Sequence, residues 1–267
     1  MADVIDIEDP ADPRVDDFRD LSDADRRPDL PGRKGSVIAE GVVVVQRMLD
    51  SRFRPAALLG VAKRHEQLAA DLAGRDVPYY RATAEVMAEI VGFHLNRGVL
   101  AVAPRPAELD AADLLATART VAVLEGVNDH ENLGSMFRNA AGFGVDAILF
   151  GDRCADPLYR RAVRVSMGHV LRVPFARLPH WPGGLDMLRD SGFQVVALTP
   201  NPAAPTLAAA LTGDRVALLL GAEGPGLTEQ TMAAADVRAR IPMAAGTDSL
   251  NVATAAAMAF YERVRTS

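Results

Sequence analysis

Short apolar runs alternate with helix-like segments through the second half of the chain, and this alternation restricts the possible folds more than any other feature of the sequence. The runs are TVAVLEG, DAILF, QVVAL, RVALLLG and RARIP, all between residues 120 and 242. Strands and helices in such alternation predict an α/β fold with a parallel sheet covered by helices. Ligands of these sheets bind beyond the carboxyl ends of the strands, so we expect the functional site in the loops after Glu125, Leu220 and Ile241.

Composition and patterning divide the 267 residues into four segments. Residues 1–30 carry a net charge of −7 in a chain whose total is −6, so the remaining residues have a net charge of +1. Few apolar residues accompany the acidic ones, which predicts a loosely ordered leader over residues 1–34. The pattern of residues 35–104 predicts a small α/β domain, the proline-led stretch 105–118 predicts a linker, and residues 119–267 are expected to form the main domain.

Membrane-spanning and disulfide-bonded proteins are poor matches to this sequence. No apolar run approaches the roughly 20 residues that span a bilayer, and the first residues lack the basic and apolar regions of a signal peptide. Cys154 is the only cysteine, which excludes an internal disulfide and a thiolate zinc site. We therefore expect a cytoplasmic protein without membrane contact.

The loop after the first apolar run is more polar than a turn requires. Residues 128–132 read NDHEN and precede the helix-like segment LGSMFRNAAG. One interpretation makes Asn132 the N-cap of that helix and leaves Arg138 on a solvated face, and the other has both side chains act on a ligand. A metal site of the HExxH type is excluded, because its second histidine would stand where the chain has Gly134.

A glycine-rich turn follows the fourth apolar run. In LLLGAEGPGLTE, Gly221, Gly224 and Gly226 stand between a predicted strand and a predicted helix. Such glycines allow the backbone to approach a ligand closely and leave amide N–H groups to bind it, although an ordinary tight turn has the same composition. A dinucleotide site fits poorly, since GxxGxG reverses the usual GxGxxG and too little chain follows for a nucleotide fold.

The loop after the last run, IPMAAGTDSLNV, leads into an alanine-rich helix. Ser249 or Asn251 is placed to cap this helix, which again provides a purely structural explanation. Three polar or glycine-rich loops at strand ends within one domain nevertheless indicate a shared ligand site.

Together, these loops resemble the three motifs of the SpoU class, also called TrmH, of the SPOUT superfamily of RNA ribose 2'-O-methyltransferases. NLGSMFRNA matches the first motif, GAEGPGL the second, and IPM followed by SLNV the third, in the family's order. The resemblance covers roughly residues 118–265. Two positions depart from the family pattern, since His130 stands where proline is common and Ala222 where asparagine is common, and both concern substrate choice more than reaction type.

The resemblance implies a SPOUT-type parallel sheet with a deep trefoil knot at its C-terminal end, preceded by a small α/β RNA-binding domain. It also implies S-adenosyl-L-methionine as the cofactor, held largely by backbone groups and apolar packing. The implied cofactor-binding residues are Leu220, Gly221, Gly224, Gly226, Ile241, Met243 and Leu250. The implied catalytic residues are Asn132, Arg138, Glu223, Ser249 and Asn251.

The implied reaction is attack by a ribose 2'-hydroxyl on the sulfonium methyl group, with no metal. Alignment of the reacting atoms can contribute roughly 7 to 11 kcal/mol. A guanidinium with a pKa above about 12 is a poor base, so we assign Arg138 to the target phosphate and the developing alkoxide. Asn132, Ser249 and Asn251 are expected to position the ribose and Arg138.

Structured RNA and a second copy of the chain are the expected partners, the homodimer packing through the knot and the last helix. Ribosomal RNA is favoured over tRNA as the substrate, while housekeeping and antibiotic-resistance roles both stay open. The alternative is a catalytically silent RNA-binding or scaffolding protein on the same fold, although such a protein has no need of all five catalytic-type residues. The basic candidates for phosphate contacts are Arg52, Arg54, Lys63, Arg64, Arg160, Arg161 and Arg164.

Overall fold

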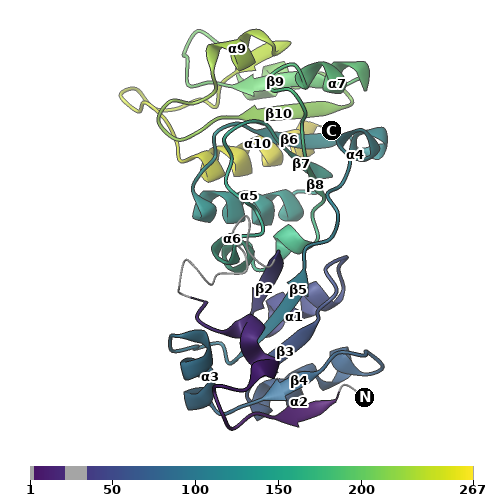
Figure 1. Ribbon diagram of the computed structural model, residues 1–267. Coiled ribbons are helices and arrows are strands. Elements are labelled where there is room, and N and C mark those ends of the chain that lie inside the picture. The colour runs from purple at the N-terminus through teal and green to yellow at the C-terminus, as the bar shows by residue number, and fades with distance from the viewer. Residues whose placement is uncertain (1–2, 22–34, 267) are drawn as a thin grey trace. The chain divides into compact units, whose positions relative to one another are not determined.

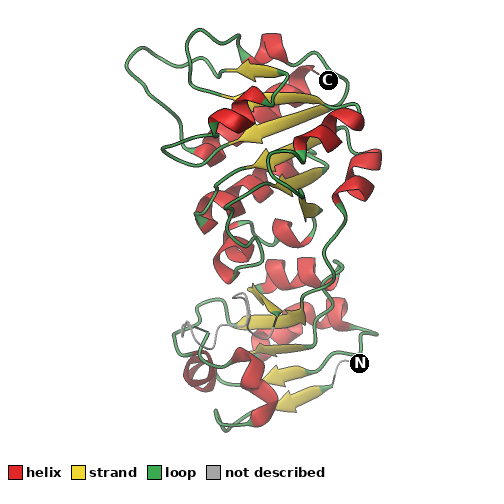
Figure 2. Cartoon of the chain, turned by 45° about the horizontal axis from the view of Figure 1, so that its top comes forward, coloured by secondary structure: helices red, strands yellow, loops and turns green. Residues whose placement is uncertain are grey.

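The computed structural model describes residues 3–21 and 35–266 of the chain (Figures 1 and 2). The chain forms two compact units, each built from two stretches of sequence. The first unit comprises Met1–Ala107 and Leu158–Arg172, and the second comprises Glu108–Pro157 and Val173–Ser267.

The first unit is built on a five-stranded mixed sheet with the order β1-β4-β3-β5-β2. Its central strand β3 is parallel to β4 and antiparallel to β5. The strands are β1 (Val4–Asp6), β2 (Ser36–Glu40), β3 (Ala57–Gly60), β4 (Tyr79–Arg81) and β5 (Val99–Pro104). The helices are η1 (Pro13–Phe18), α1 (Val42–Leu49), α2 (Ala62–Leu72), α3 (Ala84–Val91), α6 (Arg160–Val165) and η2 (His169–Leu171).

The prediction of a loosely ordered leader is wrong for residues 3–21. Strand β1 pairs in parallel with β4, and Val15, Phe18 and Leu21 are at most 1% exposed in the core of the first unit. Their apolar side chains outweigh the acidic composition around them, because burial depends on where a few large residues fall rather than on the average of the segment. Residues 22–34, the rest of the predicted leader, lie outside the described part of the chain.

The expected uninterrupted domain over residues 119–267 differs from the observed division, because α6 and η2 pack with the first unit. The guanidiniums of Arg160 and Arg164 lie 3.8 and 4.0 Å from the Glu40 carboxylate at the end of β2. The Arg47 side chain of α1 also donates a hydrogen bond to the Met167 carbonyl. These contacts join segments more than a hundred residues apart, so local sequence patterns do not reveal them.

The second unit is built on a six-stranded sheet with the order β11-β9-β10-β6-β7-β8, in which every pair is parallel. The strands are β6 (Thr120–Leu124), β7 (Ala147–Phe150), β8 (Phe175–Arg177), β9 (Gln194–Leu198), β10 (Val216–Leu220) and β11 (Val237–Ala239). The helices are α4 (Ala111–Thr117), α5 (His130–Gly142), α7 (Leu185–Asp190), α8 (Leu207–Ala210), α9 (Glu229–Ala233) and α10 (Val252–Thr266).

This sheet confirms the predicted α/β fold and its parallel strands. Four of the five apolar runs contain one strand each, and RARIP overlaps β11, whereas β8, only three residues long, was not predicted. Every residue of β7 and β10 is buried, as expected for parallel strands covered on both faces. Helices α5 and α10 lie side by side (Figure 1), and the Asn139 side chain donates to the Ala253 carbonyl at 3.0 Å.

Among residues 3–21 and 35–266, no helix has both the length and the apolar character needed to cross a membrane.

The buried leader leads to the first testable prediction. Phe18→Ala removes a fully buried ring and should lower the free energy of unfolding by about 3–5 kcal/mol. Val4→Ala, at a residue 38% exposed in the same leader, should change it by less than about 0.5 kcal/mol. Urea unfolding followed by circular dichroism makes the comparison, and equal, small effects of both changes would mean that the leader does not contribute to the core.

Candidate active site

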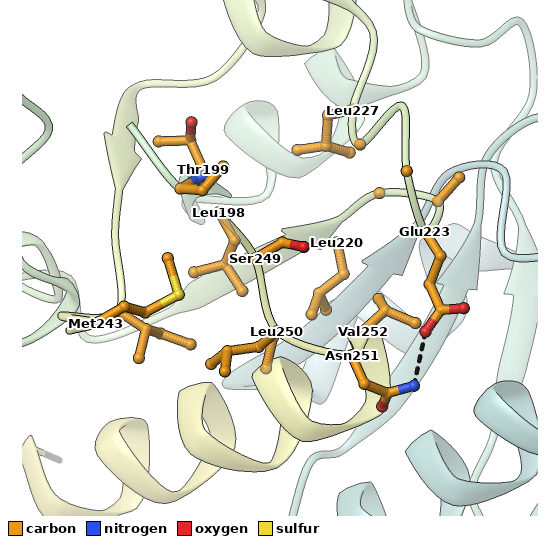
Figure 3. A pocket seen from close by; sticks show the side chains of 17 residues that line it. Leu198, Thr199, Leu220, Glu223, Leu227, Met243, Ser249, Leu250, Asn251 and Val252 are labelled. Carbon is orange, nitrogen blue, oxygen red and sulfur yellow. Dashed lines mark hydrogen bonds between the residues drawn. The ribbon is translucent and has the colours of Figure 1, made fainter. Parts of the chain in front are cut away.

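A cavity of about 430 Å³ opens at the carboxyl ends of β9 and β10 (Figure 3). Its volume lies in the range of small-molecule and cofactor sites. Three stretches line it: residues 198–200 at the end of β9, residues 220–224 and 226–227 at the end of β10, and residues of the segment from 241 to 255. The parallel pairing of β10 with β9, Leu219 opposite Ala197, brings the first two stretches to one edge of the sheet.

The cavity is apolar along most of its length and polar at one end. Leu198, Leu220 and Leu250 form its walls with Met243, while Glu223 and Asn251 lie together at the end opposite Met243 (Figure 3). All seven predicted cofactor-binding residues line it: Leu220, Gly221, Gly224, Gly226, Ile241, Met243 and Leu250. Of the predicted catalytic residues, Glu223, Ser249 and Asn251 also line it.

The three glycines of the turn after β10 have different roles. A Cβ at Gly221 would lie 2.2 Å from backbone atoms of Gly226 and Leu227, so glycine here allows the turn to close on itself. Gly224 and Gly226 have φ of 84° and 72°, and a Cβ at either would meet nothing within 4 Å. Their backbone conformation requires glycine, and the open space beside them leaves the backbone accessible from the cavity.

Asn251 organises the polar end of the cavity. Its side-chain amide donates to Oδ1 of Asn132 at 2.7 Å and to Oε1 of Glu223 at 2.6 Å. Its own Oδ1 accepts from the backbone N–H of Thr254 at 3.1 Å, so Asn251 also caps α10. One residue from each predicted motif therefore meets at this point. The capping role of Asn251 is confirmed, and its role in the functional site stays a prediction.

The prediction that Asn132 caps α5 is wrong. The helix begins at His130, and the N-cap is Asp129, whose Oδ1 accepts from the backbone N–H groups of Glu131 and Asn132 at 2.8 Å each. An aspartate just before the helix satisfies the first amide groups. The Asn132 side chain is therefore available to meet Asn251.

Arg138 lies outside the cavity lining. It is an exposed residue of α5 and is without a hydrogen-bond or ion-pair partner among the residues described. Arg138 stands six positions after Asn132 on this helix, which places the two side chains about 120° apart around the helix axis. The structure thus assembles four of the five predicted catalytic residues and leaves the fifth on the surface.

The predicted RNA-binding residues are all in the first unit. Arg160 and Arg164 surround Glu40 as described above, while Arg161 is exposed beside them on α6. Arg52 donates to the Ala107 carbonyl at 2.8 Å, and Arg64 donates to the Gln67 side chain at 2.7 Å. Arg54 and Lys63 are exposed. Our expectation that Arg160, Arg161 and Arg164 belong to the unit that holds the cavity is therefore wrong.

Sequence reasoning missed two parts of this region. Leu198, Thr199 and Pro200 line the cavity, and the signal for them was the parallel strand QVVAL, whose carboxyl end reaches the same edge of the sheet. It also missed the side chain of Glu125, which is 2% exposed. Burial raises the pKa of Glu125, but hydrogen bonds from Thr228, Trp181 and Thr231 outweigh burial and hold this pKa below its ordinary value.

Comparison with known proteins identifies the family. Residues 119–261 match the model of the SpoU rRNA Methylase family, which covers more than half of the chain. A relative from Mycobacterium tuberculosis strain H37Rv, described as an uncharacterized tRNA/rRNA methyltransferase, is 65% identical over 266 residues, which span 98% of this chain and 92% of the relative. The chain belongs to the SpoU rRNA methylase family.

More distant members share both the sequence pattern and the fold. The 23S rRNA (guanosine-2'-O-)-methyltransferase RlmB of Vibrio parahaemolyticus is 33% identical over 175 residues, 64% of this chain and 70% of that protein. An AdoMet-bound rRNA methyltransferase from Sinorhizobium meliloti superposes with a TM-score of 0.81 at 27% identity, covering 98% of each chain. This SpoU methylase is therefore an RNA methyltransferase whose cofactor is S-adenosylmethionine.

The residues of the cavity suit this cofactor. Leucine and methionine side chains can pack against a neutral adenine, and the glycine turn leaves space and backbone groups on one side. Glu223, at the polar end, offers a negative charge in a site for a positively charged sulfonium.

The distinct glycine roles lead to a second prediction. Gly221→Ala forces the turn open and should weaken S-adenosylmethionine binding by more than about 10-fold. Gly224→Ala requires only an unfavourable φ, which costs about 1–2 kcal/mol of stability, and should weaken binding by less than about 3-fold. Isothermal titration calorimetry compares the two, and an equal loss for both variants would contradict the assignment of Gly221 to turn closure.

Proposed function

We propose that this SpoU methylase transfers the methyl group of S-adenosylmethionine to a ribose 2'-hydroxyl of structured ribosomal RNA. The observation that carries the proposal is the meeting of Asn132, Glu223 and Asn251, one from each motif, at the polar end of an apolar cavity. The RlmB relative is described as a 23S rRNA (guanosine-2'-O-)-methyltransferase. This supports the ribose 2'-hydroxyl as the methylated group and ribosomal RNA as the substrate.

The apolar part of the cavity is the proposed cofactor site. Backbone groups of Gly221, Ile241 and Leu250 would hold the adenine between the leucine side chains, and the bound cofactor supplies the methyl group that is transferred. We further propose that the segment after β11 forms the deep trefoil knot of the family. Residues 241–251 connect β11 to α10 while lining the cavity, which supports this proposal.

The polar cluster would present the ribose to the methyl group. The side-chain oxygen Oδ1 of Asn132 accepts a hydrogen bond from Asn251. The side-chain N–H groups of Asn132 therefore point elsewhere and can donate to a ribose oxygen. Glu223 uses Oε1 for Asn251 and keeps Oε2 for a hydroxyl proton or a second donor. Asn251, with its donors and acceptor engaged inside the protein, holds the other two in place, and Ser249 also lines the cavity.

Arg138 is proposed to bind the phosphate of the target nucleotide. Its exposed position is suited to a ligand that arrives from solvent, and a guanidinium is a strong phosphate donor but a poor base. Through the phosphate that it binds, Arg138 would bring its positive charge to the target nucleotide and stabilise the developing alkoxide, while a phosphate oxygen or water accepts the proton. No metal is required in this scheme, because alignment and charge stabilisation are both supplied by side chains.

The arginine cluster of the first unit is a proposed phosphate-binding surface. Arg97 and Arg160 each lie 3.8 Å from the Glu40 carboxylate, and Arg164 lies 4.0 Å from it. Three guanidiniums are thus gathered around one carboxylate in a chain that is acidic overall. RNA backbones are bound by such clusters largely through electrostatic attraction.

A homodimer is proposed on the apolar surface of α10. Met258, Tyr261 and Val264 are 42%, 54% and 51% exposed on this helix, and Phe143 contacts the Tyr261 ring edge to face at a centroid distance of 6.1 Å. Exposed apolar side chains clustered on one helix are typical of subunit contacts. We place the protein in the cytoplasm, where its RNA substrate is made.

The third prediction tests the function directly. Methyl transfer from labelled S-adenosylmethionine to unmodified ribosomal RNA should label one ribose 2'-oxygen, and Asn132→Ala should lower the rate by roughly 100-fold. Arg138→Ala should do the same without weakening cofactor binding. Activity should persist in EDTA.

The matched control is Asp129→Ala, which removes the true helix cap. It should cost about 1 kcal/mol of stability and keep most of the activity, whereas Asn132→Ala should leave stability nearly unchanged. Label on a base instead of a ribose would contradict the proposed reaction, and cofactor binding without transfer to any RNA would favour the silent RNA-binding alternative.

A further inference from the structure

Both ends of the glycine-rich turn that walls the cavity are held by one buried residue. The backbone N–H of Glu125 donates to the carbonyl of Leu220, the last residue of β10, at 3.0 Å. The carboxylate of Glu125 accepts from the backbone N–H of Thr228 at 2.9 Å and from its hydroxyl at 3.0 Å. The turn of residues 221–227 therefore starts and ends at contacts with Glu125.

A third contact fixes the carboxylate itself. The indole N–H of Trp181 donates to Oε1 of Glu125 at 2.8 Å, and the indole ring packs so closely on Gly151 that a Cβ there would lie 2.6 Å from it. The Arg153 guanidinium lies 3.9 Å from the same oxygen. A carboxylate that is 2% exposed needs such donors to stay charged and in place.

Apart from Glu125, the turn is held by the hydrogen bond from Asn251 to Glu223 and by the buried side chain of Leu227. Few side-chain contacts define the stretch between these points. Gly224 and Gly226 bring no side chains, and a Cβ at either position would touch nothing. Within the turn, the Gly226 N–H donates to the Ala222 carbonyl at 3.0 Å. The glycine stretch between these fixed points would lose conformational freedom when a ligand binds, unless the protein had already ordered it.

We propose that Glu125 is a positioning residue for S-adenosylmethionine: by holding both ends of the turn 221–227, it fixes the cavity wall before the cofactor enters. The inference rests on the proposed cofactor site and adds a residue that does not line that cavity. Glu125 acts through Leu220 and Thr228, so it should control cofactor affinity and leave the chemical step unaffected.

The test compares Glu125→Gln with Glu229→Gln by titration calorimetry. The first change replaces the buried carboxylate by a group of the same shape that turns an N–H toward the donors of Thr228 or Trp181. The second makes the same chemical change at a side chain that is 91% exposed, next to the turn. Glu125→Gln should raise the Kd for S-adenosylmethionine by about 10-fold or more, and Glu229→Gln should leave it unchanged.

Two further measurements separate positioning from general stability. The KM for S-adenosylmethionine should rise in Glu125→Gln while kcat at saturating cofactor stays within about 3-fold of the wild type. Trp181 is the only tryptophan of the chain, so its fluorescence reports on the contact. Cofactor should shift Trp181 emission in Glu125→Gln, where it must order the turn, and leave it nearly unchanged in the wild type.

The outcomes distinguish this inference from the proposed cofactor site. Leu250→Arg blocks the cavity and should abolish binding; wild-type affinity in that variant would overturn the site itself. Loss of binding in Leu250→Arg with an unchanged Kd in Glu125→Gln would overturn only the role of Glu125. If Glu125→Gln does not fold, Trp181→Phe is the deciding variant, because it removes one hydrogen-bond donor to the Glu125 carboxylate. A Kd for S-adenosylmethionine raised about 3-fold would support the positioning role of Glu125, and an unchanged Kd would contradict it.

Discussion

The parallel pairing of β10 with β6 on one side and β9 on the other is the constraint on which the site depends. Leu220 lies opposite Leu124, and Leu219 lies opposite Ala197. This register brings the ends of three strands to one edge of the sheet, where their loops meet although β6 and β10 are almost a hundred residues apart in sequence. Because these strands are buried on both faces, a shift in register would disrupt the whole core, so the position of the loops is strongly fixed.

The chemistry of the site follows from how few charges it contains. The cavity walls are largely apolar, and the one charged side chain among the described residues that line it, Glu223, lies at one end, where Asn251 joins Asn132 and Glu223. An apolar wall suits an uncharged ring, while the single carboxylate can face a sulfonium or a hydroxyl. The charges proposed to attract RNA lie elsewhere, at Arg138 and at the arginines around Glu40, so the proposed cofactor and RNA sites are different kinds of surface.

Much of the second unit could be predicted from its sequence, because the strands are continuous apolar runs and the motifs fall at their ends. The cap of α5 could not, since Asp129 and Asn132 are both good capping residues and only the helix start decides between them. The roles of the three glycines were also hidden, because the contact of Gly221 with Gly226 depends on the folded turn. The placement of α6 in the first unit could not be predicted either, because its ion pairs with Glu40 join distant segments and produce no pattern in the local sequence.

Hydrogen exchange with and without S-adenosylmethionine tests the central claim most directly, namely that one edge of the sheet in the second unit holds the cofactor. The backbone amides of residues 221–228 and 249–252 should gain protection, with the amides of β2 to β5 in the first unit unchanged. Cofactor binding that leaves residues 221–228 unprotected, or that protects the first unit instead, would contradict this claim.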